Sequence, residues 1–262
     1  MSNVSSKDNK AQPDHKKGDA ITWGPTAAIL MTLVAFLAAY VGADLLAYLV
    51  PHILGWNSAQ ADKWFNSVSG QFVFVAIAES LTFGTILAFL HRRKTTIKAL
   101  GFKRRPVLND AIKAVVAYLI YFAAVLVITS VASALVHLNV DQKQELGFDT
   151  VVGLGDKLMT FFSLVILPPI VEEILFRGFL FTGLRTKLSF RWVAVIVSLI
   201  FASLHLAEAS DGILWVAGLD TFILSLVLCY LREKTGNLWA GILVHALKNG
   251  IAFFFLYVVA TA

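Results

Sequence analysis

The sequence of 262 residues contains one cysteine, Cys229, and few charged residues. A single cysteine excludes an intramolecular disulfide, and it cannot build a metal site by itself. Charged residues make up 15% of the chain and hydrophobic residues 58%, whereas about a quarter of a soluble domain is charged. This composition excludes an ordinary soluble domain and predicts an integral membrane protein.

Apolar runs are the main feature that is present. Most of them approach the roughly 20 residues that span a bilayer as a helix, and they lack the strict alternation of barrel strands. The seven runs cover 24–50, 71–91, 111–136, 158–184, 192–206, 213–231 and 238–260, of which 192–206 is short. We therefore predict an all-α fold, a polytopic transmembrane helix bundle of about seven spans.

The remaining polar segments indicate domain organisation and orientation. Residues 1–20 are polar and of mixed charge, which predicts a disordered cytoplasmic tail ahead of a single membrane domain at 21–262. Of the 22 Lys and Arg residues, 17 fall on one set of loops, 3 on the opposite set and 2 inside the spans. The positive-inside rule then puts the N-terminus in the cytoplasm. The net charge of +5 follows from this bias, so it gives no reason to propose a nucleic-acid partner.

Two adjacent carboxylates and an arginine interrupt the fourth apolar run, in the stretch VEEILFRG at 171–178. Each charge at a helix centre costs roughly 2.5–3.5 kcal/mol on insertion scales. Glu173 and Arg177 are one helical turn apart, in the order that favours an ion pair. Glu172 points about 100° away from Glu173 on an ideal helix and needs another partner. A functional site and a purely structural ion-pair triad are both open at this point.

The same run contains the stretch LPPIVEE at 167–173. Pro168 and Pro169 remove two backbone donors and clash with the preceding turn. A helix can restart at Pro169, which suits a first helical position. We expect a local water pocket beside Glu172, with a simple kink as the alternative.

Two further motifs carry histidines inside apolar runs. FASLH at 201–205 puts Phe201 and His205 one turn apart on a helix, and HALKN at 245–249 does the same for His245 and Asn249. Either pair could be an interhelical hydrogen-bond pair. At a rise of about 1.5 Å per residue, Glu172 and both histidines fall in one layer of the membrane. Their coincidence predicts one shared site in an internal polar cavity.

Other intramembrane polar residues have no predicted role. They are Asp44, Glu79, Asp220 and Lys248. Lys248 lies next to Asn249, and we expect it to pair with one of the three carboxylates.

The motifs EEILFR, FASLH and HALKN resemble, in this order, the EExxxR, FxxxH and HxxxN motifs of the CPBP intramembrane proteases, also called the CAAX protease and bacteriocin-processing (Abi) family. The resemblance covers about 158–250. It implies an intramembrane endopeptidase whose catalytic helices lie in that segment, and site residues at Glu172, Glu173, Arg177, His205, His245 and Asn249.

The resemblance also implies partners. Eukaryotic members of this family remove the last three residues of prenylated CAAX proteins, and bacterial members are tied to peptide maturation and bacteriocin immunity. The expected partners are membrane lipids and a membrane-associated protein or peptide substrate, with or without an attached lipid. The expected location is the bacterial cell membrane.

Two versions of the chemistry remain open. In one, Glu172, His205 and His245 hold Zn²⁺ as an open three-ligand site, although the zinc-binding motif HExxH is absent from the sequence. In the other, Glu172 and His205 deprotonate water while His245 and Asn249 donate hydrogen bonds to the oxyanion. In both versions Glu172 is the general base, and Glu173 and Arg177 position the other groups.

Two non-proteolytic functions compete with this interpretation. One is a non-catalytic bacteriocin-immunity or membrane scaffold protein, which would tolerate the loss of Glu172. The other is a transporter, because broken helices and midplane charges also mark transport sites.

Overall fold

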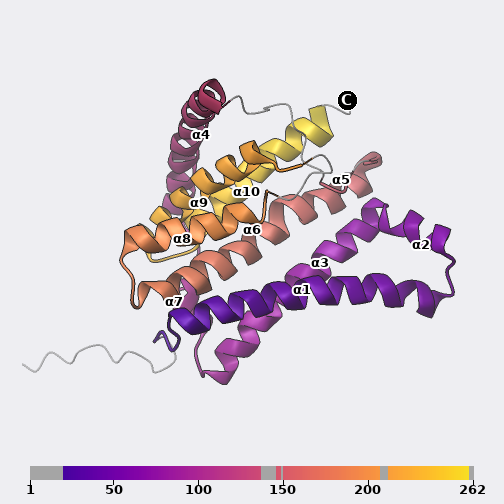
Figure 1. The fold of residues 1–262 in the computed structure, drawn as a ribbon, viewed down its shortest axis with the longest axis horizontal. Coiled ribbons are helices and arrows are strands. Elements are labelled where there is room, and N and C mark those ends of the chain that lie inside the picture. The colour runs from indigo at the N-terminus through magenta and orange to yellow at the C-terminus, as the bar shows by residue number, and fades with distance from the viewer. Residues whose placement is uncertain (1–19, 137–145, 149, 207–211, 260–262) are drawn as a thin grey trace, which may run out of the picture.

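The structure is a computed structural model that describes residues 20–136, 146–148, 150–206 and 212–259. The predicted disordered tail lies outside the described residues except for Ala20. Every regular element in the described ranges is helical (Figure 1). In chain order the elements are α1 (Pro25–Leu54), α2 (Ser58–Phe65), α3 (Val68–Arg92), η1 (Ile97–Leu100), α4 (Leu108–Val136), α5 (Gly153–Phe161), η2 (Phe162–Ile166), α6 (Leu167–Glu172), η3 (Glu173–Leu180), α7 (Phe181–Arg185), α8 (Phe190–Ser203), α9 (Trp215–Thr235), α10 (Trp239–Phe254) and η4 (Phe255–Val259).

The predicted all-α membrane bundle is confirmed, with one difference in the spans. Six helical stretches of the described chain are long and apolar enough to cross a membrane: Pro25–Leu54, Val68–Arg92, Leu108–Val136, Gly153–Arg185, Trp215–Thr235 and Trp239–Val259. The predicted run at 192–206 forms α8, a helix of 14 residues. At about 1.5 Å per residue α8 is roughly 21 Å long, shorter than a hydrocarbon core of about 30 Å. It is short because residues 204–206 leave the helix and form a turn.

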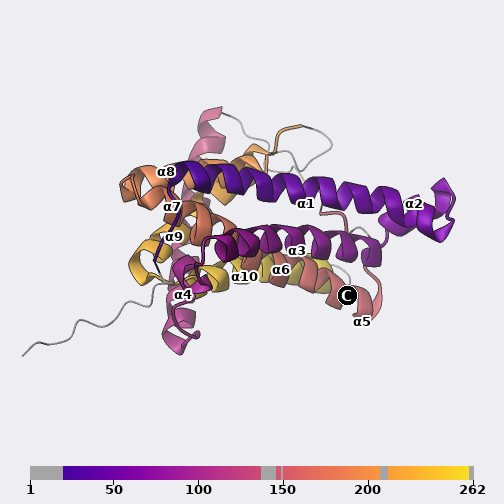
Figure 2. The same ribbon diagram turned by 90° about the horizontal axis from the view of Figure 1, so that it is seen from below.

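The stretch Gly153–Arg185 is the centre of the bundle, and we call it the central rod (Figures 1 and 2). It consists of α5, η2, α6, η3 and α7 in succession. Helices α1 and α3 pack against each other and against the rod, while α8, α9 and α10 contact it from other directions. Helix α4 packs outside α9 and α10. The rod therefore has protein neighbours where a peripheral span would have lipid.

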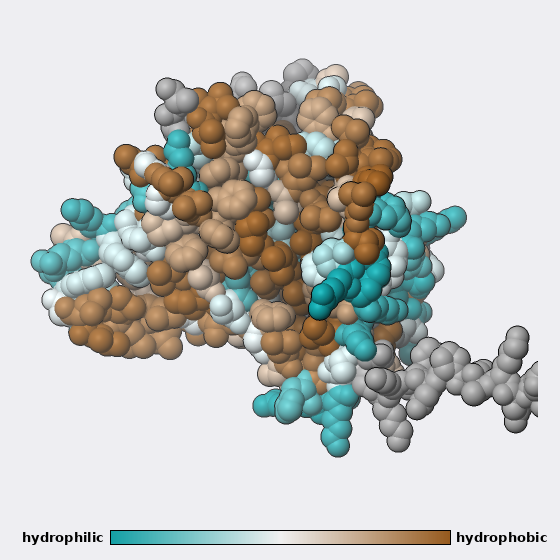
Figure 3. All heavy atoms as spheres, turned by 180° about the vertical axis from the view of Figure 1, so that it is seen from behind, coloured by the Kyte–Doolittle hydropathy of each residue, from teal (hydrophilic) through white to brown (hydrophobic). Residues whose placement is uncertain are grey.

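Burial follows this arrangement. All eight residues of η3 are buried, including a glutamate and an arginine. On the periphery, by contrast, apolar side chains are exposed: Leu37 of α1 is 63% exposed and Leu119 of α4 is 60% exposed. Figure 3 shows hydrophobic residues over most of one face, with hydrophilic residues gathered toward its margins. Lipid tails are as apolar as leucine, so the outer helices suit a bilayer, whereas the polar residues of the rod are enclosed by protein.

The rod is not a regular α-helix. Residues Phe162–Ile166 and Glu173–Leu180 are π-helical, separated by the short α-helix Leu167–Glu172. Pro168 and Pro169 lie at the start of that α-helix, close to the predicted restart. Single π-helical turns are frequent at functional sites. Here the second π-helical segment begins at Glu173, directly after Glu172.

Candidate active site

Glu172 and Glu173 are adjacent in sequence but have different surroundings. Glu173 is fully buried, with 1% of its side chain exposed, whereas 26% of the Glu172 side chain is exposed. The boundary between α6 and η3 falls between them. Glu172 lines two cavities, one of about 600 Å³ and one of about 290 Å³. Of the two carboxylates, only Glu172 faces a space that a substrate or water can occupy.

The buried carboxylate Glu173 forms an ion pair with Arg177. Arg177 Nη1 donates to Glu173 Oε1 at 2.7 Å, and Arg177 Nη2 donates to Ser225 Oγ of α9 at 2.6 Å. The guanidinium carbon also lies 4.5 Å from the centre of the Phe201 ring, which is a cation–π contact. The pair therefore ties the rod to α8 and α9. The sequence predicted the pairing with Glu173, but nothing in it singled out Ser225.

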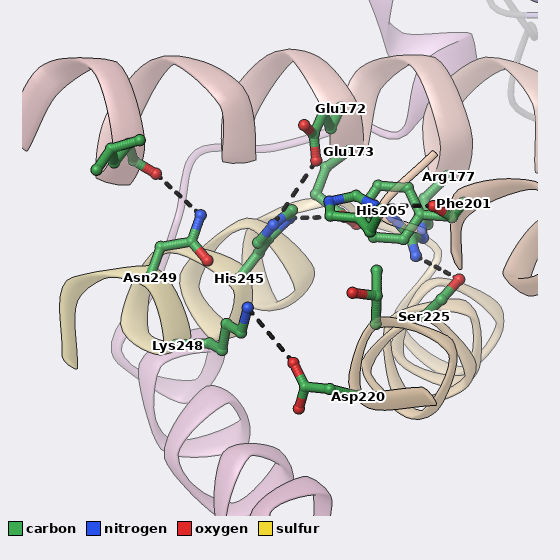
Figure 4. Close-up of polar contacts among 12 residues, drawn as sticks. Glu172, Glu173, Arg177, Phe201, His205, Asp220, Ser225, His245, Lys248 and Asn249 are labelled. Carbon is green, nitrogen blue, oxygen red and sulfur yellow. Dashed lines mark hydrogen bonds and ion pairs between the residues drawn. The ribbon is translucent and has the colours of Figure 1, made fainter. Parts of the chain in front are cut away.

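Helix α10 approaches Glu173 through a glycine. A Cβ atom on Gly241 would lie 3.0 Å from Glu173 Oε2, a contact so short that the carboxylate would have to shift. One turn further along α10, His245 is 4% exposed and faces both carboxylates (Figure 4). Its Nδ1 is 3.4 Å from Glu173 Oε1, and its Nε2 is 3.7 Å from Glu172 Oε2. His245 thus lies between the buried and the accessible carboxylate.

His205 is not on the helix that the sequence predicted for it. Helix α8 ends at Ser203, and His205 lies in the turn that follows. Its Nδ1 is 2.9 Å from the Phe201 carbonyl oxygen, one of the carbonyls that a helix end leaves without an intrahelical partner. A carbonyl only accepts, so Nδ1 carries the proton of this hydrogen bond. In the neutral ring Nε2 then has the free lone pair.

Asn249 forms a hydrogen bond at the point where the two prolines interrupt the central rod. Asn249 Nδ2 donates to the Leu164 carbonyl oxygen at 2.9 Å. The α-helical donor for that carbonyl would be residue 168 and the π-helical donor would be residue 169. Both are prolines, which have no N–H. The two prolines therefore free a carbonyl, and the Asn249 amide satisfies it.

The larger cavity brings the predicted residues together. Glu172, His205, His245 and Asn249 all line it, along with Pro168. The expected space beside Glu172 is therefore present next to the proline break. Glu173 and Arg177 do not line either cavity; they lie behind Glu172 and His245.

The smaller cavity extends the site toward α1 and α3. It shares Glu172, Phe201 and His205 with the larger one, and most of its other lining is apolar. Glu79 of α3 also lines it. Glu79 was recognised in the sequence as a costly intramembrane charge, but its position next to the site follows only from the packing of α3 on the rod.

Lys248 forms its expected ion pair with Asp220. The Lys248 Nζ lies 3.5 Å from Asp220 Oδ2 on α9, and Asp220 Oδ1 accepts a hydrogen bond from the Tyr121 hydroxyl on α4. Of the three candidate partners, Asp44 and Glu79 are thus not the ones used. Tyr121 had no signal in the sequence, because a tyrosine in an apolar helix is common.

The side chains do not converge as a zinc site. In the described part of the chain, no three His, Cys, Asp or Glu side chains form a group that could hold a metal ion. Glu172, His205 and His245 offer the donor types that zinc prefers and line one cavity. Their positions nevertheless do not fit a common ion.

Comparison with known protein families gives a match over part of the chain. Residues 154–251 match the family model described as type II CAAX prenyl endopeptidase Rce1-like. No curated protein and no solved structure gives a match. The matched segment contains the central rod except for Gly153, and it contains all six predicted site residues. The resemblance read from the three motifs is therefore confirmed, and it supports intramembrane endopeptidase activity in general terms.

Because the ion pair between Glu173 and Arg177 is buried, removing its arginine should destabilise the protein more than removing a partly exposed arginine. Arg177→Met leaves Glu173 as an uncompensated buried charge, so we expect a loss of about 3–5 kcal/mol of stability. Arg185→Met is the matched control, because Arg185 and Glu233 form a pair with about a third of each side chain exposed and such pairs contribute up to about 1 kcal/mol. Thermal unfolding in detergent measures both. Adding Glu173→Gln to Arg177→Met should recover part of the loss; equal effects of the two single variants would contradict this prediction.

Proposed function

We propose that this protein is an intramembrane endopeptidase in which Glu172 activates a water molecule that attacks a peptide bond of a membrane-associated substrate. The observation that carries the proposal is that Glu172 is the one carboxylate among the described residues lining the larger cavity, together with His205, His245 and Asn249. Amide hydrolysis needs a base, donors for an oxyanion and a proton for the leaving amine. The cavity contains groups for each task.

The first step is attack by water. Glu172, as the carboxylate, removes a proton from water while the water oxygen bonds to the scissile carbonyl carbon. His205 assists, because its Nδ1–H is engaged by the Phe201 carbonyl and its Nε2 lone pair can accept a hydrogen bond from that water. In the second step the C–N bond breaks, and the proton held by Glu172 passes to the leaving nitrogen.

The oxyanion is stabilised from α10. Asn249 uses one amide hydrogen on the Leu164 carbonyl, and an amide has two, so the second is available to the developing oxyanion. His245 donates through Nε2 only as an imidazolium, because its Nδ1 faces the Glu173 carboxylate. Removing one such donor in other hydrolases lowers the rate by about 10²–10³-fold.

Glu173 and Arg177 act as positioning residues. Glu173 orients the His245 ring, and Arg177 fixes Glu173 through the 2.7 Å hydrogen bond. Neither lines the cavities, so neither is expected to touch the substrate.

The smaller cavity suits an apolar part of the substrate. Its lining from α1 and α3 is mainly apolar and aromatic, and it meets the larger cavity at Glu172 and His205. We propose that it accepts a membrane-embedded segment or an attached lipid, as the prenyl endopeptidase name of the matching family suggests. On the bias of Lys and Arg among the loops, the proposed orientation has the N-terminus in the cytoplasm, and the proposed location is the bacterial cell membrane.

Replacement of Glu172 tests the proteolytic function. Glu172→Gln keeps the shape of the side chain and removes the base, so we expect cleavage to fall by at least about 10²-fold with an unchanged unfolding temperature. Glu233→Gln is the matched control, because Glu233 lines neither cavity, and it should retain full activity. The measurement compares peptide termini in membranes of cells that express each variant at the same level.

The outcome also separates the competing functions. Termini that appear with the wild type and with Glu233→Gln, but not with Glu172→Gln, support a protease and identify its substrate. If all three give the same termini while a host phenotype persists with Glu172→Gln, the protease proposal is wrong and a non-catalytic immunity or scaffold role takes its place.

The proline break allows the structural and catalytic contributions of Asn249 to be separated. Asn249→Leu leaves the Leu164 carbonyl unpaired, which should cost about 1–3 kcal/mol of stability. Pro168→Ala supplies an N–H four residues after Leu164, so the double variant should regain stability. We expect it to remain inactive, because the oxyanion donor is still missing. Recovery of activity along with stability would make Asn249 purely structural.

Of the two versions of the chemistry, we propose the one without a metal, and no step above depends on zinc. Because the three donors do not converge on one point, we expect purified protein to retain activity in the presence of EDTA. Metal analysis of the same preparation should find much less than one zinc per chain. Loss of activity in EDTA that added Zn²⁺ restores, together with loss of bound zinc in Glu172→Gln, would favour the metal version.

A further inference from the structure

Lys248 is a cation in the larger cavity that the mechanism above does not use. It lines this cavity together with Glu172, His245 and Asn249. A lysine inside a membrane helix is costly, and such charges commonly mark functional sites. Its ion pair with Asp220 does not explain its presence, because apolar residues in place of a buried ion pair are often equally stable or more stable.

Lys248 shares one face of α10 with the two proposed oxyanion donors. His245, Lys248 and Asn249 all belong to this helix. At about 100° per residue, the three side chains fall within a sector of about 100°, and Lys248 is only about 4.5 Å further along the helix axis than His245. The cation is therefore next to the place where the proposed oxyanion forms.

The counterion of Lys248 does not line the cavity. Asp220 Oδ2 lies 3.5 Å from Lys248 Nζ, and Asp220 is absent from the cavity lining. The Tyr121 hydroxyl of α4 donates to Asp220 Oδ1, which anchors the carboxylate from a third helix. In Figure 4 the Lys248 side chain extends between His245 and Asp220. The ion pair is thus a dipole with its positive end toward the oxyanion donors.

Attack by water moves negative charge toward this cation. Before the step the charge is on the Glu172 carboxylate of the central rod. Afterwards Glu172 holds the proton from water, and the charge is on the former carbonyl oxygen of the substrate, at the donors of α10. The net charge is unchanged, but its position differs. A fixed cation on α10 stabilises the second arrangement more than the first, and only such a difference accelerates the chemical step.

We propose that Lys248 is a further catalytic residue, whose ammonium stabilises the oxyanion beside His245 and Asn249. Asp220 and Tyr121 hold the ammonium in place and are positioning residues. The proposal rests on the proposed endopeptidase function and adds a residue to it. A tight charge-assisted hydrogen bond is about 2.7–2.9 Å long, whereas this pair is at 3.5 Å. Because an ammonium has three donors, Lys248 can turn toward the new charge and keep Asp220 as its partner.

Kinetics separate this role from substrate binding. The probe is a peptide that the comparison of wild type with Glu172→Gln identifies as cleaved, assayed with the full-length protein in detergent. Lys248→Gln should lower kcat by about 10- to 100-fold and leave KM unchanged, because the substrate carbonyl is neutral before attack. Lys248→Arg keeps the cation and should retain more activity than Lys248→Gln.

Binding of a transition-state analogue is a second readout that does not depend on turnover. A phosphinate in place of the scissile amide has a tetrahedral, negatively charged centre, whereas the amide is planar and neutral. Lys248→Gln should weaken binding of the phosphinate peptide by the same factor as it lowers kcat/KM. Binding of the amide peptide to Glu172→Gln should be the same with and without Lys248→Gln. A purely structural lysine would change both affinities together.

Two further variants control for charge and folding. Lys248→Gln combined with Asp220→Asn removes both charges, and it should be as slow as Lys248→Gln alone. Because this double variant leaves no unpaired charge, it replaces Lys248→Gln in both assays if the single variant does not fold. Lys187→Gln, at an exposed lysine between α7 and α8, should have the kcat of the wild type. Thermal unfolding in detergent checks that each variant is folded.

The possible results distinguish this proposal from the one it rests on. A lower kcat at constant KM, together with weaker binding of the phosphinate peptide, supports the role of Lys248. Unchanged kcat in Lys248→Gln, an equal loss of affinity for both peptides, or recovery of kcat on adding Asp220→Asn overturns that role and leaves the endopeptidase intact. If the wild type gives no cleavage product, the endopeptidase is contradicted and the role of Lys248 is overturned with it.

Discussion

The ion pair between Glu173 and Arg177 is the interaction on which the arrangement of the site depends. Both side chains are buried in the middle of the central rod, where an unpaired charge would be strongly unfavourable. Satisfying Arg177 recruits Ser225 from α9 and the Phe201 ring from α8. Satisfying Glu173 brings His245 from α10. The helices that carry the other functional residues are therefore held together by one buried charge cluster.

The proline break in the central rod lies beside the larger cavity. Two consecutive prolines leave the Leu164 carbonyl without a donor in either helical geometry, and Asn249 supplies one. Such a break is tolerated in a membrane only where other protein groups satisfy the backbone. The same arrangement directs the Asn249 amide and Glu172 toward one cavity. The rod thus loses helical regularity at the point where a polar space is needed.

The two cavities divide the site by polarity. The smaller is lined mainly by apolar residues of α1 and α3, whereas the larger carries Lys248, His245 and Asn249. They meet at Glu172 and His205. A substrate that lies across this junction presents an apolar part to one cavity and a polar part to the other. Selectivity for a substrate can then come from the cavities themselves.

The helical membrane fold could be predicted from the sequence alone, because the length and continuity of the apolar runs leave few other ways to satisfy the backbone hydrogen bonds. It also identified the six polar residues of the three motifs, since charges and histidines in such runs are rare. Tertiary packing decided the rest. The motifs do not predict that α8 ends before His205. They also do not predict that Asn249 donates to the Leu164 carbonyl, which the two prolines leave without a backbone donor, or that Lys248 pairs with Asp220 and not with Glu79. Each of these depends on which helices become neighbours, and helical periodicity carries no information about neighbours distant in the chain.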